Sequence, residues 1–211
     1  MRLIGMLDSP YVRRVAISLD VLGMQFRHES VSVFSTFDQF RAINPIVKAP
    51  TLVCGDGTVL MDSSLILQYL EAAAGRSLWA TGVPLEQQFR AVGVALAACE
   101  KGAQIVYERN LRPISAQYEP WMKRVTGQLL AACAALEEQV RAQPEVFSDA
   151  ATQPAITTAV VWGFVQAMLA PLVPAASYPA LSAVAAPLES TDLFLKYPSE
   201  GPGVPGVANQ A

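Results

Sequence analysis

The sequence predicts two units, an α/β unit over about the first 75 residues and an all-helical unit after it. In the first part, short apolar runs alternate with amphipathic stretches in the order β-α-β-α-β-β-α. In the second part, apolar residues recur three and four positions apart, which is typical of helices. We therefore expect an α/β unit at 1–75, a turn-rich linker at 76–84, a helical unit at 85–200 and a loose tail at 201–211.

The first apolar run, residues 3–7, is long enough for one buried strand, and a helical pattern begins directly after it. Ser9 suits the N-cap of that helix, and Pro10 suits its first position because proline lacks the N–H that would be unpaired there. The apolar face consists of Val12, Val15, Ala16, Leu19 and Leu22. A strand thus delivers a serine hydroxyl to a helix N-terminus, whose partial positive charge favours an anion. The alternative is that Ser9 only caps the helix.

The rest of the first unit is predicted from alternation, turns and capping residues. Two prolines, Pro45 and Pro50, bracket an extended loop, and Gly55-Asp56-Gly57 forms the turn of a hairpin. Asp62-Ser63-Ser64 carries strong N-capping chemistry, and Gly75 follows the end of the helix that it opens. The intervening elements are a strand at 26–33, a helical turn at 36–41 and hairpin strands at 51–54 and 58–61.

The second unit is expected to hold four main helices. Its most apolar stretch, residues 159–173, is interrupted by Gln166 and Pro171 and is shorter than the roughly 20 residues that span a bilayer. It is apolar nearly all round, so it should form the central core helix of a soluble protein. The helices are predicted at 85–111, at 121–142, from Thr152 through this stretch, and at 178–188.

Composition excludes several functional classes. Apolar residues make up 52% of the chain and charged residues 16%, which fits a folded core rather than disorder. The net charge is −3 with no long basic run, so neither nucleic acid nor a membrane surface is expected as a partner. No signal peptide is recognisable at the start, and we expect a cytoplasmic protein.

Cysteine and histidine usage argues against a metal site. Cys54, Cys99 and Cys133 are far apart, without metal-ligand spacing, and the last two lie in alanine-rich helical patterns that favour buried, inert thiols. His28 is the single histidine, and its strand-like surroundings predict a surface residue. Multi-histidine zinc sites are therefore excluded, and a Ser-His-Asp triad is not expected.

Three motifs give the chain a specific resemblance. They are Ser9-Pro10-Tyr11-Val12-Arg13 after the first strand, Lys48-Ala49-Pro50-Thr51-Leu52 before the third, and Asp62-Ser63-Ser64-Leu65-Ile66 at the third helix. In this order, followed by an all-helical remainder, they resemble the cytosolic glutathione transferases, in the bacterial type with serine at the activating position. The resemblance implies a thioredoxin-like α/β domain, an all-α domain, glutathione as co-substrate without a metal, and a homodimer.

The resemblance assigns Ser9 to the position of the family's activating hydroxyl or cysteine. A free cysteine thiol has a pKa near 8.5, so only a few per cent of it is ionised at about pH 7. Lowering that pKa by about two units requires roughly 2.7 kcal/mol of preference for the anion. A hydroxyl donor at a helix N-terminus suits that task. We expect Ser9 to donate to the glutathione sulfur, and the thiolate to attack a small apolar electrophile.

The same resemblance assigns the glutathione contacts. Ala49-Pro50 corresponds to the family's cis X-Pro step, which would present the Ala49 backbone to the cysteinyl part of the ligand as in strand addition. Lys48 is a candidate for the glycyl carboxylate, with a solvated loop lysine as the alternative. Asp62 and Ser63 match the acidic-Ser motif that holds the γ-glutamyl end, and they can cap the helix as well.

The electrophile site is expected between the loop at Leu7-Asp8 and the long helix from Leu85. Its candidate walls are Leu7, Tyr11, Tyr107 and Trp121, although an aromatic residue on a helix is more often part of the core. Serine at position 9 argues against dithiol exchange on the enzyme. A glutathione-dependent peroxidase, reductase or lyase on the same scaffold, and a non-enzymatic glutathione-binding or interaction protein, remain alternative functions.

Overall fold

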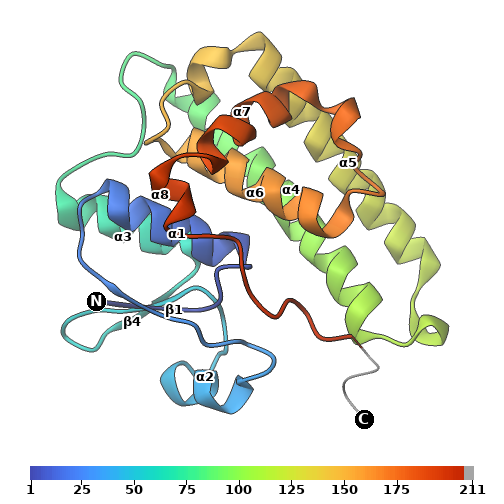
Figure 1. The fold of residues 1–211 in the computed structure, drawn as a ribbon, viewed down its shortest axis with the longest axis horizontal. Helices are drawn as coiled ribbons and strands as arrows, with labels where there is room; N and C mark the ends of the chain where they lie inside the picture. The colour runs from blue at the N-terminus through green and yellow to red at the C-terminus, as the bar shows by residue number, and fades with distance from the viewer. Residues whose placement is uncertain (207–211) are drawn as a thin grey trace. The chain divides into compact units, whose positions relative to one another are not determined.

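The computed structural model describes residues 1–206, which belong to two compact units. Unit 1 comprises Met1–Leu78 together with Ser190–Gly201, and unit 2 comprises Trp79–Glu189 and the chain from Pro202 onward. Unit 1 holds a mixed sheet with helices, and unit 2 is helical (Figure 1). The predicted fold class is confirmed: a thioredoxin-like α/β part is followed by a predominantly helical part.

The sheet of unit 1 has four short strands in the order β2-β1-β3-β4. β1 pairs with β2 in parallel and with β3 in antiparallel orientation, and β3 and β4 form the predicted hairpin. β1 and β2 are shorter than the predicted runs. β1 ends at Ile4, where the chain turns at Gly5, whose φ of +141° favours glycine. The bounds are Arg2–Ile4 (β1), Arg27–Glu29 (β2), Thr51–Val53 (β3) and Val59–Met61 (β4).

Helices cover both faces of this sheet. α1 (Pro10–Val21) and α3 (Ser63–Ala74) pack against each other on one face, and α2 lies on the other (Figure 1). α2 spans Phe37–Ile43 and is a full helix where the sequence predicted a helical turn, because Phe40 anchors it in a core cluster with Ile4.

The segment Ser190–Gly201 belongs to unit 1 although it lies late in the chain. It contains the short helix α8 (Asp192–Leu195). Arg13 of α1 is buried against this segment, where its Nε donates to the carbonyl of Tyr197 at 2.7 Å. Its guanidinium also lies over the Phe194 ring, 5.4 Å from the centroid. A buried arginine holds this late part of the chain, and hydrophobic periodicity does not reveal such contacts.

Unit 2 is built around α6, which is buried along most of its length, as its apolar sequence predicts. α6 packs against α4 and α7. Gly102 of α4 permits the close approach to α6, because a Cβ there would lie 3.0 Å from Phe164 and 3.2 Å from Leu169. The bounds are Leu85–Leu111 (α4), Glu119–Ala142 (α5), Gln153–Leu169 (α6) and Pro179–Glu189 (α7).

Within residues 1–206, Val204 of the expected tail is anchored, since its carbonyl accepts a hydrogen bond from Asn110 Nδ2 at 3.1 Å. The remainder of that tail, residues 207–211, lies outside the described residues. Among the described helices, none combines the length and apolar character needed to cross a membrane. The same residues contain no cluster of three or more histidine, cysteine or acidic side chains suited to a metal ion.

Candidate functional site

The start of α1 leaves a serine hydroxyl without a capping role. Ser9 is the N-cap, with extended backbone angles, and its carbonyl accepts hydrogen bonds from the N–H groups of Val12 and Arg13 at 3.0 Å. Its half-buried side chain makes no capping hydrogen bond. The backbone of Ser9 therefore begins the helix, while its hydroxyl remains available at a helix N-terminus.

The loop before β3 brings Ala49 to the same part of unit 1. The Ala49–Pro50 peptide bond is cis, as expected. A Cβ placed on Gly5 would lie 2.6 Å from a methyl of Val12 and 3.3 Å from Cβ of Ala49, so Ala49 adjoins the first turn of α1. Within residues 1–206, no backbone hydrogen bond occupies the N–H or C=O of Ala49. Both groups are therefore available to an extended ligand.

Side chains behind this loop fix its shape. The buried Asn44 donates from Nδ2 to Thr51 Oγ1 at 2.8 Å, and that hydroxyl donates to the carbonyl of Lys48 at 2.7 Å. Asn44 Oδ1 also accepts from the N–H of Ile46. A buried polar chain of this kind holds a loop in one conformation because each broken bond would leave a buried group unpaired.

The start of α3 brings together three of the predicted glutathione contacts. Asp62, at a φ of 69°, is the N-cap, and its carboxylate accepts from the Ser64 N–H at 3.0 Å. Lys48 Nζ lies 3.8 Å from the other carboxylate oxygen. Both of these side chains are about half exposed, whereas Ser63 is buried. A cation, an anion and a hydroxyl thus meet at one helix N-terminus, an arrangement that suits a zwitterionic ligand.

Sequence reasoning missed Arg14, which also reaches this point. Arg14 is only 2% exposed on α1, and its Nη1 donates to Ser63 Oγ at 3.3 Å and Ser64 Oγ at 3.4 Å. The periodicity predicts a single apolar face on α1, but the helix is buried nearly all round. The signal was Ile17, an apolar residue outside that face, one turn from Arg14.

The candidate electrophile walls belong to separate units. Leu7 and Tyr11 are half-buried in unit 1, next to Ser9 in the sequence. Tyr107 on α4 and Trp121 on α5 are 44% and 40% exposed in unit 2. Their exposure is compatible with contacting a ligand, and their role in an electrophile site stays a prediction.

His28 is half-buried rather than a surface residue. Its Nε2 lies 2.8 Å from the carbonyl of Gly5. Because a carbonyl only accepts, Nε2 must carry the proton in this contact. His28 therefore ties β2 to the end of β1, beneath the loop that leads to Ser9, and its role there is structural.

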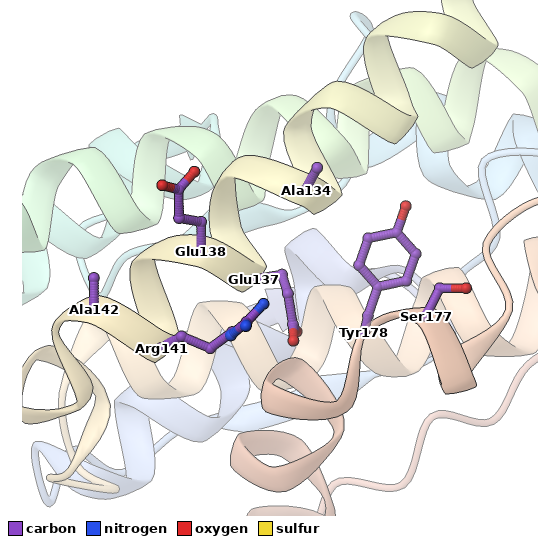
Figure 2. Close-up of a pocket in the computed structure, with 7 residues that line it drawn as sticks. All are labelled: Ala134, Glu137, Glu138, Arg141, Ala142, Ser177 and Tyr178. Atoms are coloured by element: carbon purple, nitrogen blue, oxygen red, sulfur yellow. The ribbon is translucent and has the colours of Figure 1, made fainter.

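Unit 2 contains a pocket of about 570 Å³ that at first suggests a second site (Figure 2). Its deepest acid, Glu137, is 5% exposed and accepts hydrogen bonds from the N–H groups of Ala180 and Leu181, both at 2.9 Å. These amides open α7, so the carboxylate stabilises that helix and is already occupied. The pocket is lined by Ala134, Glu137, Glu138, Arg141, Ala142, Ser177 and Tyr178.

The three thiols lie outside the candidate site. Cys99 and Cys133 are buried, and burial raises the pKa of the Cys133 thiol to about 11, so both fit the inert role predicted for them. Cys54 is half-buried after β3, and its thiol raises the pKa of the Tyr69 phenol through a hydrogen bond. None of these cysteines occupies the N-cap of α1, where Ser9 stands.

Comparison with known proteins finds similarity to glutathione transferases in the N-terminal part of the chain and in the fold. Residues 3–78 match the family model described as "Glutathione S-transferase, N-terminal domain". The three predicted glutathione-binding motifs all lie inside that match. The match covers nearly all of the first part of unit 1, Met1–Leu78, and does not include its late segment, Ser190–Gly201.

Three known proteins show the extent of this similarity. The uncharacterized GST-like protein YibF of Escherichia coli is 32% identical over 71 residues, a match that spans only 35% of that protein and 34% of this chain. A glutathione S-transferase of Methylobacterium radiotolerans, solved with glutathione sulfonate, has a TM-score of 0.83 and 24% identity, covering 98% of this chain and 95% of that one. A glutathione S-transferase of Methylobacillus flagellatus, solved with bound glutathione, has a TM-score of 0.82 and 18% identity. This match covers 93% of this chain and 98% of that one. The structural matches establish the fold over both units.

Proposed function

We propose that this protein is a glutathione transferase that activates the thiol of glutathione as a thiolate. The observation that carries the proposal is the Ser9 hydroxyl, which stands at the N-terminus of α1 without a capping bond. The family match over residues 3–78 supports it, as does the fold shared with transferases solved with glutathione sulfonate or with glutathione.

Ser9 stabilises the nucleophile and does not itself attack. Its hydroxyl donates one charge-assisted hydrogen bond to the sulfur anion, and the field of α1 adds to the preference for negative charge. Each effect contributes on the order of 1–2 kcal/mol, which together approach the roughly 2.7 kcal/mol needed to lower a thiol pKa by about two units. The proton leaves the thiol for solvent, and the thiolate sulfur then bonds to an electrophilic carbon. Either that carbon releases its leaving group with the electron pair of the broken bond, or, in an addition, the π bond opens and the product takes a proton from solvent.

The remaining contacts hold glutathione in register with Ser9. The N–H and C=O of Ala49, beside the first turn of α1, pair with the cysteinyl backbone, and Pro50 fixes the edge they form. Asp62 pairs with the γ-glutamyl ammonium group, and the Ser63 hydroxyl and N–H meet its carboxylate. Lys48, which is half exposed and 3.8 Å from Asp62, pairs with the glycyl carboxylate.

The second substrate is proposed to be a small apolar electrophile, with Leu7, Tyr11, Tyr107 and Trp121 as candidate contacts. A peroxidase, reductase or lyase would use the same glutathione contacts and differ in the second substrate.

By the same resemblance we propose a cytoplasmic homodimer. The exposed apolar residues of α3, Leu65 at 63% and Tyr69 at 42%, fit burial against a second copy.

Calorimetric titration with glutathione tests this function first. We expect saturable binding, followed by conjugation of at least one member of a panel of small apolar electrophiles at a rate above the uncatalysed reaction. Absence of binding would favour the interaction-protein alternative. Binding with turnover of peroxides or disulfides alone would favour the peroxidase or reductase.

A further inference from the structure

Two consecutive arginines on α1 are both buried, and they contact different parts of unit 1. Arg13 is 3% exposed and donates to carbonyls of the segment Ser190–Gly201, so its contacts hold the fold together. Arg14 is 2% exposed and donates to the hydroxyls of Ser63 and Ser64 at the start of α3. Arg14 therefore adjoins a proposed ligand contact, whereas these hydrogen bonds of Arg13 go to a late segment of the chain.

We propose that Arg14 is a positioning residue that orients the Ser63 hydroxyl so that it donates to the γ-glutamyl carboxylate of glutathione. The proposal rests on the function proposed above and extends it to a residue that never touches the ligand. It depends on the contact between Arg14 Nη1 and Ser63 Oγ at 3.3 Å.

Donor and acceptor chemistry determines where the proton of the Ser63 hydroxyl points. A guanidinium only donates, so Ser63 Oγ must accept in its contact with Arg14. A serine hydroxyl has one proton and two lone pairs, and with a lone pair engaged by Arg14 the proton is directed elsewhere. A carboxylate only accepts, so it is the ligand group that matches such a hydroxyl.

Charge adds to this orientation. The guanidinium of Arg14 stays protonated at any ordinary pH, and within a buried site it favours a nearby anion. The N-terminus of α3 contributes in the same sense. Together they predict that this end of the site prefers a carboxylate strongly over a neutral amide of the same shape.

Titration of two ligands measures this preference. The probes are glutathione and its analogue in which the γ-glutamyl α-carboxylate is a primary amide. The preference is the dissociation constant of the amide divided by that of glutathione. We expect this ratio to fall by about tenfold in Arg14→Met, since the hydrogen bond of Ser63 to the charged carboxylate is lost. Arg14→Lys, which keeps a cationic donor, should restore part of that ratio.

Arg13→Met is the matched control, because Arg13 has the same burial on the same helix and no contact with Ser63 among those described. Its stability should fall while its ligand ratio stays at the wild-type value. If Arg14→Met does not fold, Ser63→Ala carries the test, with the same fall in ratio expected. A wild-type ratio in Arg14→Met or in Ser63→Ala would overturn the proposal.

The wild-type titration separates this inference from the proposed function. A wild-type protein that binds glutathione and its amide equally would sink the role of Arg14 and leave glutathione binding intact. A wild-type protein that binds neither ligand would overturn both.

Discussion

The helices α1 and α3 both begin with a serine-containing motif, and they use it in opposite ways. At α3 the cap is occupied: Asp62 accepts from the Ser64 N–H, and Ser63 accepts from Arg14. At α1 the hydroxyl of the N-cap, Ser9, makes no capping bond. An occupied cap stabilises the fold and presents a fixed partner to a ligand, whereas an unoccupied hydroxyl can turn to a sulfur anion.

A third helix start completes the comparison. α7 obtains its acceptor from another helix, since Glu137 of α5 accepts from two of its first amides. Buried polar groups at helix ends are therefore satisfied by side chains at α3 and α7 in the described structure, and α1 differs from both. The hydroxyls of the N-cap residues Thr36 and Thr152 also make no capping bond, but they donate to the carbonyls of Ser32 and Asp149 and thereby serve the fold.

The largest effect is expected from Ser9→Ala. Loss of a donor aimed at a developing anion typically lowers a rate by about a hundredfold or more, so conjugation should fall by that order while glutathione binding changes only a few-fold. Steady-state kinetics with one electrophile measure both quantities. Ser9→Thr, which retains a hydroxyl, is the control. An unchanged rate in Ser9→Ala would mean that another donor activates the sulfur.

The next effect concerns stability rather than rate. Glu137→Gln replaces a buried carboxylate that holds two amides of α7, and we expect a loss of about 2 kcal/mol in unfolding free energy. Glu138→Gln alters the adjacent, exposed acid and should change the unfolding free energy by less than about 0.5 kcal/mol. Urea denaturation of the two variants tests the difference. Equal stabilities would show that the cap of α7 contributes little.

A smaller effect separates the two roles of Asp62. Asp62→Ala removes the cap of α3 at a φ of 69° and should cost about 1 kcal/mol, whereas Asp62→Asn keeps an acceptor and tolerates that backbone. We expect Asp62→Asn to retain stability and to bind glutathione several-fold more weakly, because it lacks the charge that faces the ammonium group. Wild-type affinity in Asp62→Asn would remove Asp62 from the ligand site.

The smallest expected effect is the stability of Ser9→Ala. Because the Ser9 side chain makes no capping bond, its removal should change the unfolding free energy by less than about 0.5 kcal/mol, below the usual cost of losing an N-cap. Thermal unfolding of Ser9→Ala and Asp62→Ala, measured side by side, compares the two losses of stability. A loss as large as that of Asp62→Ala would return Ser9 to an ordinary capping role.

Sequence reasoning could predict the elements that depend on local signals. The strand-to-helix step at Ser9, the hairpin after Pro50 and the cap at Asp62 all follow from periodicity, turn residues and capping chemistry. The apolar core helix α6 follows from its composition. The lengths of β1 and β2 could not be predicted, because pairing in the sheet limits them.

Long-range polar contacts could not be predicted at all. Arg13 reaches a carbonyl 184 positions later in the chain, and Arg14 reaches a hydroxyl 49 positions later. Ile17, one turn from Arg14, indicates that this side of α1 is buried, but the local pattern does not identify the partner of either arginine. The ligand contacts assigned from the sequence stay predictions, and the contact of Arg14 with Ser63 was not among them.

The most direct test of the account is the thiol pKa of bound glutathione, measured from thiolate absorbance against pH in the wild-type protein and in Ser9→Ala. The account predicts a pKa about two units below the free value near 8.5 in the wild type and a return toward that value in the variant. A bound thiol whose pKa matches that of free glutathione, or one equally depressed in Ser9→Ala, would contradict it.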